Sequence, residues 1–230
     1  MNMSSHCILI LCGGKGTRLS SVWTKPKALV PILGVSYLQY IIEQLTEACS
    51  NKYKIHLATG HMSSEIEKTL TGFKNEVVVN CENKPLGTGG AVASFLNDTT
   101  YEKITILNGD TLFHHLDLKA HFALIENGAP NIVAAAPIAR NERFGSISVE
   151  KFLMIQKNSE MKINDLTFAG LITLRKEDLF LCSTYPYALE DLINISKIPA
   201  NSVLLKRVQY GFHDIGTPES LELADQWLRN

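Results

Sequence analysis

The hydrophobic positions of the chain repeat with two different spacings, and these spacings predict its first elements. Residues His6 to Leu11 form an almost continuous apolar run, which is typical of a strand buried on both faces of a parallel sheet. In 36-SYLQYIIEQLTEAC-49 the apolar residues instead recur at helical spacing, and Ser36 with Gln39 matches a capping box. The opening of the chain therefore predicts a buried strand, a long loop and an amphipathic helix.

Strand-like and helix-like segments continue to alternate along more than half of the chain. With helices between them, further strands are expected at 53–59, 76–81, 103–110 and 131–137. Such alternation predicts an α/β fold with a doubly wound, mostly parallel sheet, because parallel strands are usually joined by a helix. In an open sheet of this kind, ligands bind beyond the carboxyl ends of the strands.

The pattern changes in the second half of the chain. Three segments look like antiparallel strands, and we expect them to form a small antiparallel flap beside the main sheet. They are residues 145–150, 153–157 and 167–174. A last helix is predicted over 217–228, with Thr217 as its N-cap and Pro218 in its first turn. The whole chain, residues 1–230, is expected to be a single domain.

Composition and charge narrow the functional classes. Apolar residues make up 45% of the 230 residues and charged residues 20%, the balance of a soluble globular protein. The formal net charge is −1, so no overall field attracts nucleic acid or an anionic membrane. The apolar run at 7–12 is much too short for a membrane span. Any anion that the protein binds must therefore be held by a local arrangement of groups.

The cysteines and histidines do not predict a zinc centre. The five cysteines are scattered and include no C-x-x-C pair, which favours reduced thiols in a cytoplasmic protein. None of the seven histidines stands in a zinc spacing such as H-E-x-x-H. Candidate chemistry must be sought elsewhere in the chain.

A glycine-rich, basic loop follows the first strand, in 8-ILILCGGKGTRL-19 and then 26-PKALVPI-32. Glycines allow backbone N–H groups to approach a phosphate closely, because no Cβ intervenes. Lys15, Arg18 and Lys27 add cationic side chains that suit phosphate oxygens. The loop predicts a cradle for a polyphosphate, and the alternative is a turn that only reverses the chain.

Two common phosphate-binding patterns do not match this loop. The P-loop requires G-x-x-x-x-G-K-[ST], but Gly14 and Lys15 are followed by Gly16. The dinucleotide fingerprint G-x-G-x-x-G also fails, because Leu19 stands where the third glycine should be. The predicted cradle is therefore of another kind.

Four motifs together resemble the signature of the sugar-1-phosphate nucleotidyltransferases, or nucleoside-diphosphate-sugar pyrophosphorylases. In the order and spacing of that family, they are 10-ILCGGKGTRL-19 with 26-PKALVPI-32, 85-PLGTGGA-91, 107-LNGD-110 and 213-HDIGTPE-219. The resemblance covers nearly the whole chain. It implies a Rossmann-like fold of the glycosyltransferase-A type, and a reaction in which a sugar 1-phosphate attacks the α-phosphorus of a nucleoside triphosphate and pyrophosphate leaves.

The resemblance gives roles to four charged residues. Arg18 and Lys27 match the family's catalytic cations at the triphosphate and the α-phosphate. Asp110 and Asp214 match the aspartates that hold Mg²⁺, an ion that takes one or two carboxylates together with phosphate oxygens. From the residues alone, the alternatives are solvated loop charges for the cations, a helix N-cap for Asp110 and a turn residue for Asp214.

The nucleotide is expected to contact both glycine-rich segments. The resemblance implies nucleotide-binding positions at Leu11, Gly13, Gly14, Gly16, Thr17, Glu82, Gly87, Thr88 and Asn108. Gly87 and Thr88 open a predicted helix, whose N-terminus favours polar or anionic groups. Glu82 is a candidate acceptor for the N1–H and exocyclic amine of guanine, with a surface carboxylate as the alternative.

The sugar end departs from the common pattern of the family. A Glu-Lys pair is replaced by 159-SEMK-162, and 168-FAG-170 has phenylalanine where asparagine is frequent, which predicts a changed sugar pocket. Gly145 and Lys162 are expected to bind the sugar phosphate, with a solvated strand-end lysine as the alternative for the second. The pair His114–His115 follows Asp110 closely and is a candidate for a sugar hydroxyl contact.

Within the family, the motifs are most similar to those of the D-glycero-D-manno-heptose 1-phosphate guanylyltransferase branch. GTP and a heptose 1-phosphate are therefore the favoured substrates. Mannose-1-phosphate guanylyltransferases and small uridylyl-, cytidylyl- or thymidylyltransferases remain rivals, because the Gly-Gly pair does not fix the base. A catalytically silent regulatory subunit is a further alternative, and the presence of all four charged residues argues against it.

The partners expected from the sequence are small molecules. A nucleic-acid partner is not expected, because the chain lacks a basic face and any recognition module. A membrane partner is not expected either. The family resemblance leaves a homo-oligomer open, since its members are often dimers or tetramers.

Overall fold

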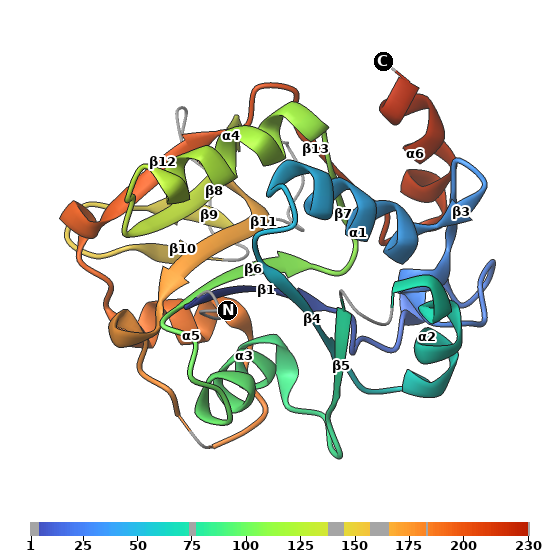
Figure 1. Cartoon of the computed structure of the whole chain (residues 1–230), viewed down its shortest axis with the longest axis horizontal. Helices are drawn as coiled ribbons and strands as arrows, with labels where there is room; N and C mark the ends of the chain where they lie inside the picture. Colours follow the sequence, from blue (N-terminus) through green and yellow to red (C-terminus); the bar gives the residue numbers. More distant parts are fainter. Residues whose placement is uncertain (1–4, 74–76, 138–144, 157–165, 183, 230) are drawn as a thin grey trace.

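The computed structural model of the protein describes five stretches of the chain, residues 5–73, 77–137, 145–156, 166–182 and 184–229. They form one central sheet with helices on both faces (Figure 1), and two small two-stranded sheets. The strands of the central sheet are β1 (His6–Leu11), β4 (Lys54–Thr59), β5 (Val77–Cys81), β6 (Lys103–Asn108), β8 (Asn131–Pro137), β9 (Ser146–Ser148), β10 (Met154–Gln156), β11 (Leu166–Arg175) and β12 (Val203–Arg207). The helices are α1 (Tyr37–Ala48), α2 (Ser63–Thr69), α3 (Gly87–Asn97), α4 (His115–Glu126), α5 (Leu189–Ser196) and α6 (Pro218–Arg229).

Parallel pairing is confined to two parts of the sheet. Strands β6, β1, β4 and β5 are neighbours in that order and run parallel, as the alternation of strand and helix predicted. Strand β12 also runs parallel to β8. The strand expected at the end of the alternating region is present as β8, but it pairs with β11 and β12 and not with β6.

Strand β11 lies between β6 and β8 and runs antiparallel to both, so the sheet is mixed. The sequence correctly predicted antiparallel strands in this region, but it placed all of them in a flap beside the sheet. The inner residues of β11 are buried along its length, which is the burial of a central strand. Only β9 and β10 extend the sheet as an antiparallel edge.

The two faces of the sheet are covered by different helices, and strand β1 shows why. Ile8 and Ile10 point into a core shared with α1 and α4, whereas Cys7 and Leu9 point into a second core shared with α3 and α5. All four side chains have no solvent exposure. Figure 1 shows α1 and α4 on one side of the sheet and α3 and α5 on the other. The continuous apolar run at the start of the chain is therefore required by burial on both faces.

The predicted caps are confirmed at the first and last helices. Ser36 accepts from the Gln39 backbone, and the Gln39 side chain accepts from the Ser36 backbone, so α1 begins with the predicted capping box. The Ser220 N–H donates to Thr217 Oγ1 over 3.3 Å at the start of α6. Helix α6 packs back on the core through Ala224, which is fully buried.

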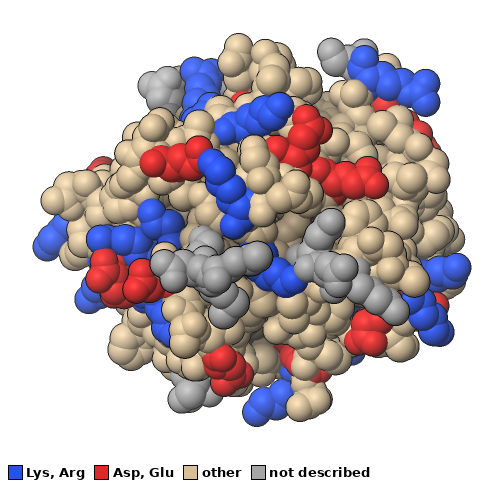
Figure 2. Space-filling model, viewed as in Figure 1, with Lys and Arg blue, Asp and Glu red and all other residues tan. Residues whose placement is uncertain are grey.

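Two small sheets were not predicted from the sequence. One joins β2 (Pro31–Ile32) to β3 (Val35–Ser36), and the other joins β7 (Thr111–Phe113) to β13 (Phe212–Asp214). In the part of the chain that the structure describes, no helix is long and apolar enough to cross a membrane. Basic and acidic side chains are interspersed over the face drawn in Figure 2.

Candidate functional site

The site begins where β1 and β6 end side by side. The Gly109 N–H donates to the Leu11 carbonyl over 3.1 Å, and the Cys12 N–H donates to the Ala58 carbonyl over 2.8 Å. A Cβ on Gly109 would lie 2.2 Å from the Leu11 carbonyl oxygen, so only glycine allows the two chains to approach this closely. The glycine of the 107–110 motif is therefore explained by packing between strands.

A cavity of about 470 Å³ opens at this edge, a volume typical of small-molecule sites. It contains most of the positions that the sequence assigned to the nucleotide, together with both predicted catalytic cations. The predicted residues that line it are Leu11, Gly13, Gly14, Arg18, Lys27, Glu82, Gly87, Thr88, Asn108 and Asp110. The prediction that the two glycine-rich segments meet in one cavity is thus confirmed, while the role of each residue stays a prediction.

A smaller cavity of about 130 Å³ adjoins the first one. Asp214 and Gly145 line it, and so does Phe168, the residue that departs from the common family pattern. Four residues line both cavities, and they are Arg18, Asn108, Asp110 and Glu190. Groups bound in the two cavities would meet at these four residues.

Glu190 is the member of this group that the sequence did not predict. It lies in the first turn of α5, a helix that was not predicted either. No motif includes it, so only the course of the chain between β11 and β12 brings its carboxylate to the junction of the cavities.

Asp110 and Asp214 are brought together by the small sheet. Strand β13 pairs with β7 so that Asp214 stands opposite Thr111, the residue after Asp110. The Ile215 N–H then donates to the Asp110 carbonyl over 2.9 Å. One Asp214 carboxylate oxygen accepts from the Gly216 N–H over 2.8 Å. The sequence expectation that these two distant carboxylates share one crevice is confirmed.

Lys27 reaches the same place from the basic loop. Its ammonium forms an ion pair with the Asp110 carboxylate, and both side chains are only 18% exposed. The loop is shaped by the short helix η2 (Lys27–Leu29) and by Trp23, whose indole N–H donates to the Pro26 carbonyl over 3.0 Å. Arg18 is exposed, on the short helix η1 (Thr17–Leu19), and lines both cavities.

Tyr37 supports the turn that carries Asp110 through hydrogen bonds to its backbone. Its side chain is fully buried, and its hydroxyl donates to the Thr111 carbonyl over 2.9 Å, with the Asn108 carbonyl 3.3 Å away. Burial raises the pKa of the Tyr37 phenol well above its ordinary value, and the nearby Asp110 carboxylate raises it further. The hydroxyl is therefore a permanent donor beneath the site.

The two aspartates form a donor set that fits Mg²⁺. Mg²⁺ is usually bound by one or two carboxylates, with substrate phosphates and water completing six oxygen ligands. No cluster of three or more histidine, cysteine or acidic side chains in the described residues is arranged to hold an ion by itself. Both aspartates line the smaller cavity, so their carboxylates could serve as two of these ligands while substrate phosphates and water supply the others. Nearby Cys12 is not a thiolate near neutral pH, because burial raises its pKa to about 12.

Glu82 lines the larger cavity and lies close to two glycines. A Cβ on Gly13 would lie 3.1 Å from its Oε1, and one on Gly60 would lie 2.8 Å from the same atom. Its other oxygen accepts from the Leu86 N–H over 3.3 Å. Burial raises the pKa of Glu82, and the Leu86 N–H opposes that shift. Glu82 is half-buried and lines the cavity, so its predicted contact with the base stays a prediction.

The second glycine-rich turn packs under residues 185–188. A Cβ on Gly87 would lie 2.4 Å from the Tyr187 carbonyl oxygen, and Gly87 has φ +74. The Thr88 hydroxyl accepts from the Leu189 N–H over 2.8 Å at the start of α5. These residues line the cavity as predicted, but they also join α3 to α5, a structural task that the motif did not reveal.

Several predicted positions lie elsewhere or are not described. Gly16 (φ +63) and Thr17 do not line either cavity, and instead they form the start of η1 that directs Arg18. Lys162 lies outside the described residues, so its predicted contact with the sugar phosphate stays a prediction. Gly145 lines the smaller cavity, where a Cβ would lie 2.6 Å from the Ile155 side chain.

The histidine pair after Asp110 does not line either cavity. His114 caps α4, accepting from the Leu116 N–H over 3.3 Å, and its ring stacks on Tyr210. His115 Nε2 lies 3.2 Å from a Glu47 carboxylate oxygen. The proposed hydroxyl contact is therefore not supported, and both rings serve packing around α4.

Comparisons with known proteins agree with this geometry. A family model described as a MobA-like NTP transferase domain matches residues 8–172. A D-glycero-alpha-D-manno-heptose 1-phosphate guanylyltransferase from Aneurinibacillus thermoaerophilus is 28% identical over 232 residues, which cover 96% of this chain and 98% of that protein.

Solved structures are similar over nearly the full length. HddC from Yersinia pseudotuberculosis complexed with GMP-PN is 25% identical with a TM-score of 0.70, covering 95% of this chain and 97% of that chain. The inositol-1-phosphate CTP transferase from T. maritima has a TM-score of 0.76 at 18% identity, covering 99% and 96% of the two chains, a likeness of fold alone.

Proposed function

The chain belongs to the family of MobA-like NTP transferase domains, and we propose that it is a guanylyltransferase that transfers GMP from GTP to a heptose 1-phosphate. A phosphate oxygen of the sugar 1-phosphate attacks the α-phosphorus of GTP. The bond between the α-phosphorus and the bridging oxygen breaks, and pyrophosphate leaves with that oxygen. The products are GDP-heptose and pyrophosphate.

One observation carries the proposal: Arg18 and Asp110 line both cavities at the point where the two cavities meet. The larger cavity has the size for a nucleoside triphosphate, and the smaller one adjoins it on the side of Asp214. The reaction joins two anionic reactants, so its main needs are positioning and neutralisation of charge. The Arg18 guanidinium would supply positive charge at the junction, and Asp110 would help to position a cation there.

We assign the positively charged groups to the phosphates. Arg18 would stabilise the charge that develops on the α-phosphate, a role supported by its position in both cavities and by the ability of a guanidinium to donate two parallel hydrogen bonds to phosphate oxygens. Lys27 forms an ion pair with Asp110 in the structure, and it would turn toward a phosphate when the substrates bind. Asp110 and Asp214 would hold Mg²⁺, which when bound neutralises phosphate charge.

Glu82 is our candidate for recognition of guanine. An ionised carboxylate accepts two hydrogen bonds in parallel, which matches the N1–H and exocyclic amine of guanine, whereas uracil offers a single N–H on that edge. The structure of HddC with GMP-PN and the heptose guanylyltransferase relative support the choice of a guanine nucleotide. They also support heptose 1-phosphate as the acceptor, since the relative is named for it.

The test is a panel of the four nucleoside triphosphates against sugar 1-phosphates, including D-glycero-α-D-manno-heptose 1-phosphate and mannose 1-phosphate. Pyrophosphate release with Mg²⁺ supplied is the readout. We expect GTP with the heptose phosphate to be the fastest pair. Asp110→Asn serves as the inactive control. If another pair reacts faster, that pair replaces GTP and heptose 1-phosphate as the proposed substrates. If no pair releases pyrophosphate, the catalytically silent regulatory subunit remains as the alternative.

The assignment of Glu82 has its own test. Glu82→Gln replaces an acceptor oxygen with an amide donor, so we expect kcat/KM for GTP to fall about 100-fold, since one buried unpaired donor costs 1–3 kcal/mol. The kcat/KM for UTP should stay unchanged or rise. An equal fall for all nucleotides would contradict a role in base recognition.

A further inference from the structure

Asp214 stands on an element that is too small to fix its own position. Strand β13 has three residues and pairs with β7, which also has three, outside the main sheet. A two-stranded pair this short is at most marginally stable alone. The residue before β13 is Gly211, at φ +82, which adds freedom to the approaching chain. The position of Asp214 therefore depends on what holds the segment that leads into β13.

That segment is held by a buried carboxylate, Asp117. The two Asp117 oxygens each accept one of two successive backbone N–H groups, from Gln209 over 2.7 Å and from Tyr210 over 2.9 Å. The Asp117 side chain is 3% exposed, and the ammonium of Lys206 lies 3.9 Å away. Hydrogen bonds to an ionised acceptor are about twice as strong as neutral ones, so this grip is firm. Asp117 also lies in the first turn of α4, where the helix favours negative charge.

The grip of Asp117 is the first of a series of contacts between the same two segments. The His114 ring stacks on the Tyr210 ring, with centroids 4.3 Å apart. Strand β7 then pairs with β13, and the Asp110 carbonyl accepts from the Ile215 N–H. Read from residue 117 back to 110, the contacts meet residues 209 to 215 in order. Residues 110–117 therefore contact residues 209–215 along the whole length of both segments.

We propose that Asp117 is a positioning residue, whose carboxylate sets the register of residues 209–215 and thereby places the Asp214 carboxylate beside Asp110. The proposal rests on the proposed function, in which these two carboxylates act together on the phosphates. Asp117 lines neither cavity, so it acts through the backbone and not on a substrate. No sequence motif contains it.

Asp117→Asn is the informative change. The amide keeps one acceptor but presents an N–H₂ group to the other backbone N–H, so one of the two hydrogen bonds is replaced by a contact between donors. We expect the Mg²⁺ concentration for half-maximal rate to rise about tenfold and kcat to fall about tenfold, the scale on which partners of metal ligands act. The KM for GTP should stay within about twofold, because residues 209–215 do not line the larger cavity.

A second readout does not use activity. Hydrogen exchange followed by mass spectrometry should show faster exchange in peptides covering 209–216 of Asp117→Asn, and unchanged exchange in β1 and α1. His114→Ala removes the stacking on Tyr210 and the N-cap hydrogen bond from the Leu116 N–H, but it leaves the Asp117 carboxylate itself unchanged. It should shift both the exchange and the Mg²⁺ dependence in the same direction by a smaller factor, and it replaces Asp117→Asn if that variant does not fold.

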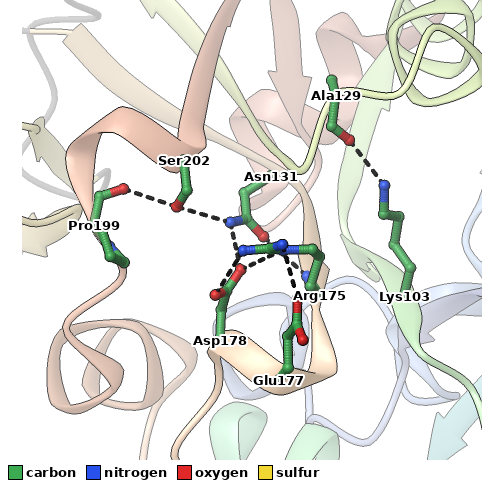
Figure 3. Close-up of polar contacts among 8 residues, drawn as sticks. All are labelled: Lys103, Ala129, Asn131, Arg175, Glu177, Asp178, Pro199 and Ser202. Atoms are coloured by element: carbon green, nitrogen blue, oxygen red, sulfur yellow. Dashed lines mark hydrogen bonds and ion pairs between the residues drawn. The ribbon is translucent and has the colours of Figure 1, made fainter.

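Asp178 offers a matched control at the opposite edge of the sheet. Figure 3 shows its carboxylate facing the Arg175 guanidinium and the Asn131 amide, and it accepts a hydrogen bond of 2.7 Å from each. Arg175 pairs across strands with Lys103 at the start of β6, whereas the site lies at the end of β6. Asp178→Asn therefore removes a comparable carboxylate without touching the residues around Asp214.

The outcomes separate a positioning role from simple loss of stability. We expect Asp178→Asn to lower the melting temperature without changing the Mg²⁺ dependence. If it reproduces the effect of Asp117→Asn at an equal loss of melting temperature, the positioning role is wrong. Unchanged Mg²⁺ dependence and kcat in Asp117→Asn would also overturn it.

An inactive wild-type protein would instead refute the proposed function. In that case the positioning role of Asp117 is tested by Mn²⁺ binding to the wild-type protein and to Asp117→Asn, measured by electron paramagnetic resonance. Weaker binding by Asp117→Asn supports it, and equal binding rejects it.

Discussion

At the scale of single residues, the site is organised around Asp110, which contacts Lys27 and Ile215 directly and is followed by a residue that Tyr37 holds. Its carboxylate pairs with Lys27, its carbonyl accepts from the Ile215 N–H, and its turn rests on the Tyr37 hydroxyl. An ionised carboxylate facing a space for phosphates would repel them if nothing opposed its charge. The Lys27 ammonium offsets that charge. When phosphates enter, they would compete with Asp110 for the ammonium, and the Lys27–Asp110 ion pair would separate.

Arg18→Ala tests the role of the guanidinium at the junction of the cavities. We expect kcat to fall about 100-fold, because a preorganised donor to developing charge is typically worth this much. The KM for the sugar phosphate should change by less than about threefold, since the interaction strengthens mainly in the transition state. Steady-state kinetics with pyrophosphate release measures both. Lys25→Ala, in the same loop but lining neither cavity, is the matched control. An unchanged kcat in Arg18→Ala would remove Arg18 from the reaction.

Tyr37→Phe tests the support beneath Asp110. The change removes only the hydroxyl that donates to the Thr111 carbonyl, and leaves that buried acceptor unsatisfied. We expect a loss of about 1 kcal/mol in the free energy of unfolding, together with a kcat reduced about fivefold by the looser turn. Urea unfolding and steady-state kinetics are the measurements. Tyr40→Phe on the same helix is the control, and a variant that loses stability but keeps full kcat would show that the hydroxyl serves the fold alone.

At the scale of elements, the long periodic segments and the antiparallel strands β9 and β10 were predicted, whereas the short strands of the two small sheets were not. Strand β1 and helix α1 carry a complete period and caps, so the sequence was sufficient for them. Strands β7 and β13 have three residues each, too few for a period to emerge. Strand β11 was recognised as a strand, but its neighbours are set by contacts distant in sequence, which a local pattern does not contain.

Gly109→Ala tests the close approach of β1 and β6. The new methyl would lie 2.2 Å from the Leu11 carbonyl oxygen, so the two strand ends must separate. We expect a loss of about 3 kcal/mol in the free energy of unfolding, at the upper end of what overpacking costs. Gly72→Ala is the control, because a Cβ there meets nothing within 4 Å and its effect should stay within about 0.5 kcal/mol. Chemical denaturation measures both, and equal stabilities would mean that the strand ends have room that the geometry does not show.

At the scale of the whole molecule, the site is a product of topology. The motifs around Asp110 and Asp214 indicated both carboxylates, but not the β7–β13 pairing that brings them together. Glu190 and Asp117 were not predicted from the sequence, because the role of each depends on contacts with segments that are distant along the chain. Residues that act through local backbone shape were thus predictable, whereas residues that act through tertiary contact were found only in the fold.

The core of the molecule also contains a polar chain that links its stability to pH. His6 Nε2 lies 2.9 Å from the Thr105 hydroxyl, Thr105 lies 2.7 Å from the Thr173 hydroxyl, and His121 Nε2 lies 2.8 Å from Thr173. Burial lowers the pKa of both His6 and His121 to about 3, with Lys103 adding to the shift of His6 and His6 to that of His121. Both rings are therefore neutral in the folded protein well below the pH at which they charge in the unfolded chain.

The sign of the pH dependence follows from these shifts. As the pH falls from about 6.5 toward 3, the unfolded chain binds protons that the folded protein does not, so folding becomes less favourable. Each histidine should lower the free energy of unfolding by about 1.4 kcal/mol per pH unit in this window. Urea unfolding at about pH 7 and about pH 5 measures the slope. His56 contributes to the same slope, because burial lowers its pKa to about 4. His121→Gln should therefore reduce the slope by roughly a third of the histidine contribution, whereas His61→Gln, at an exposed position, controls for the loss of a histidine as such. Equal slopes in all three proteins would show that the polar chain accepts a proton within the fold.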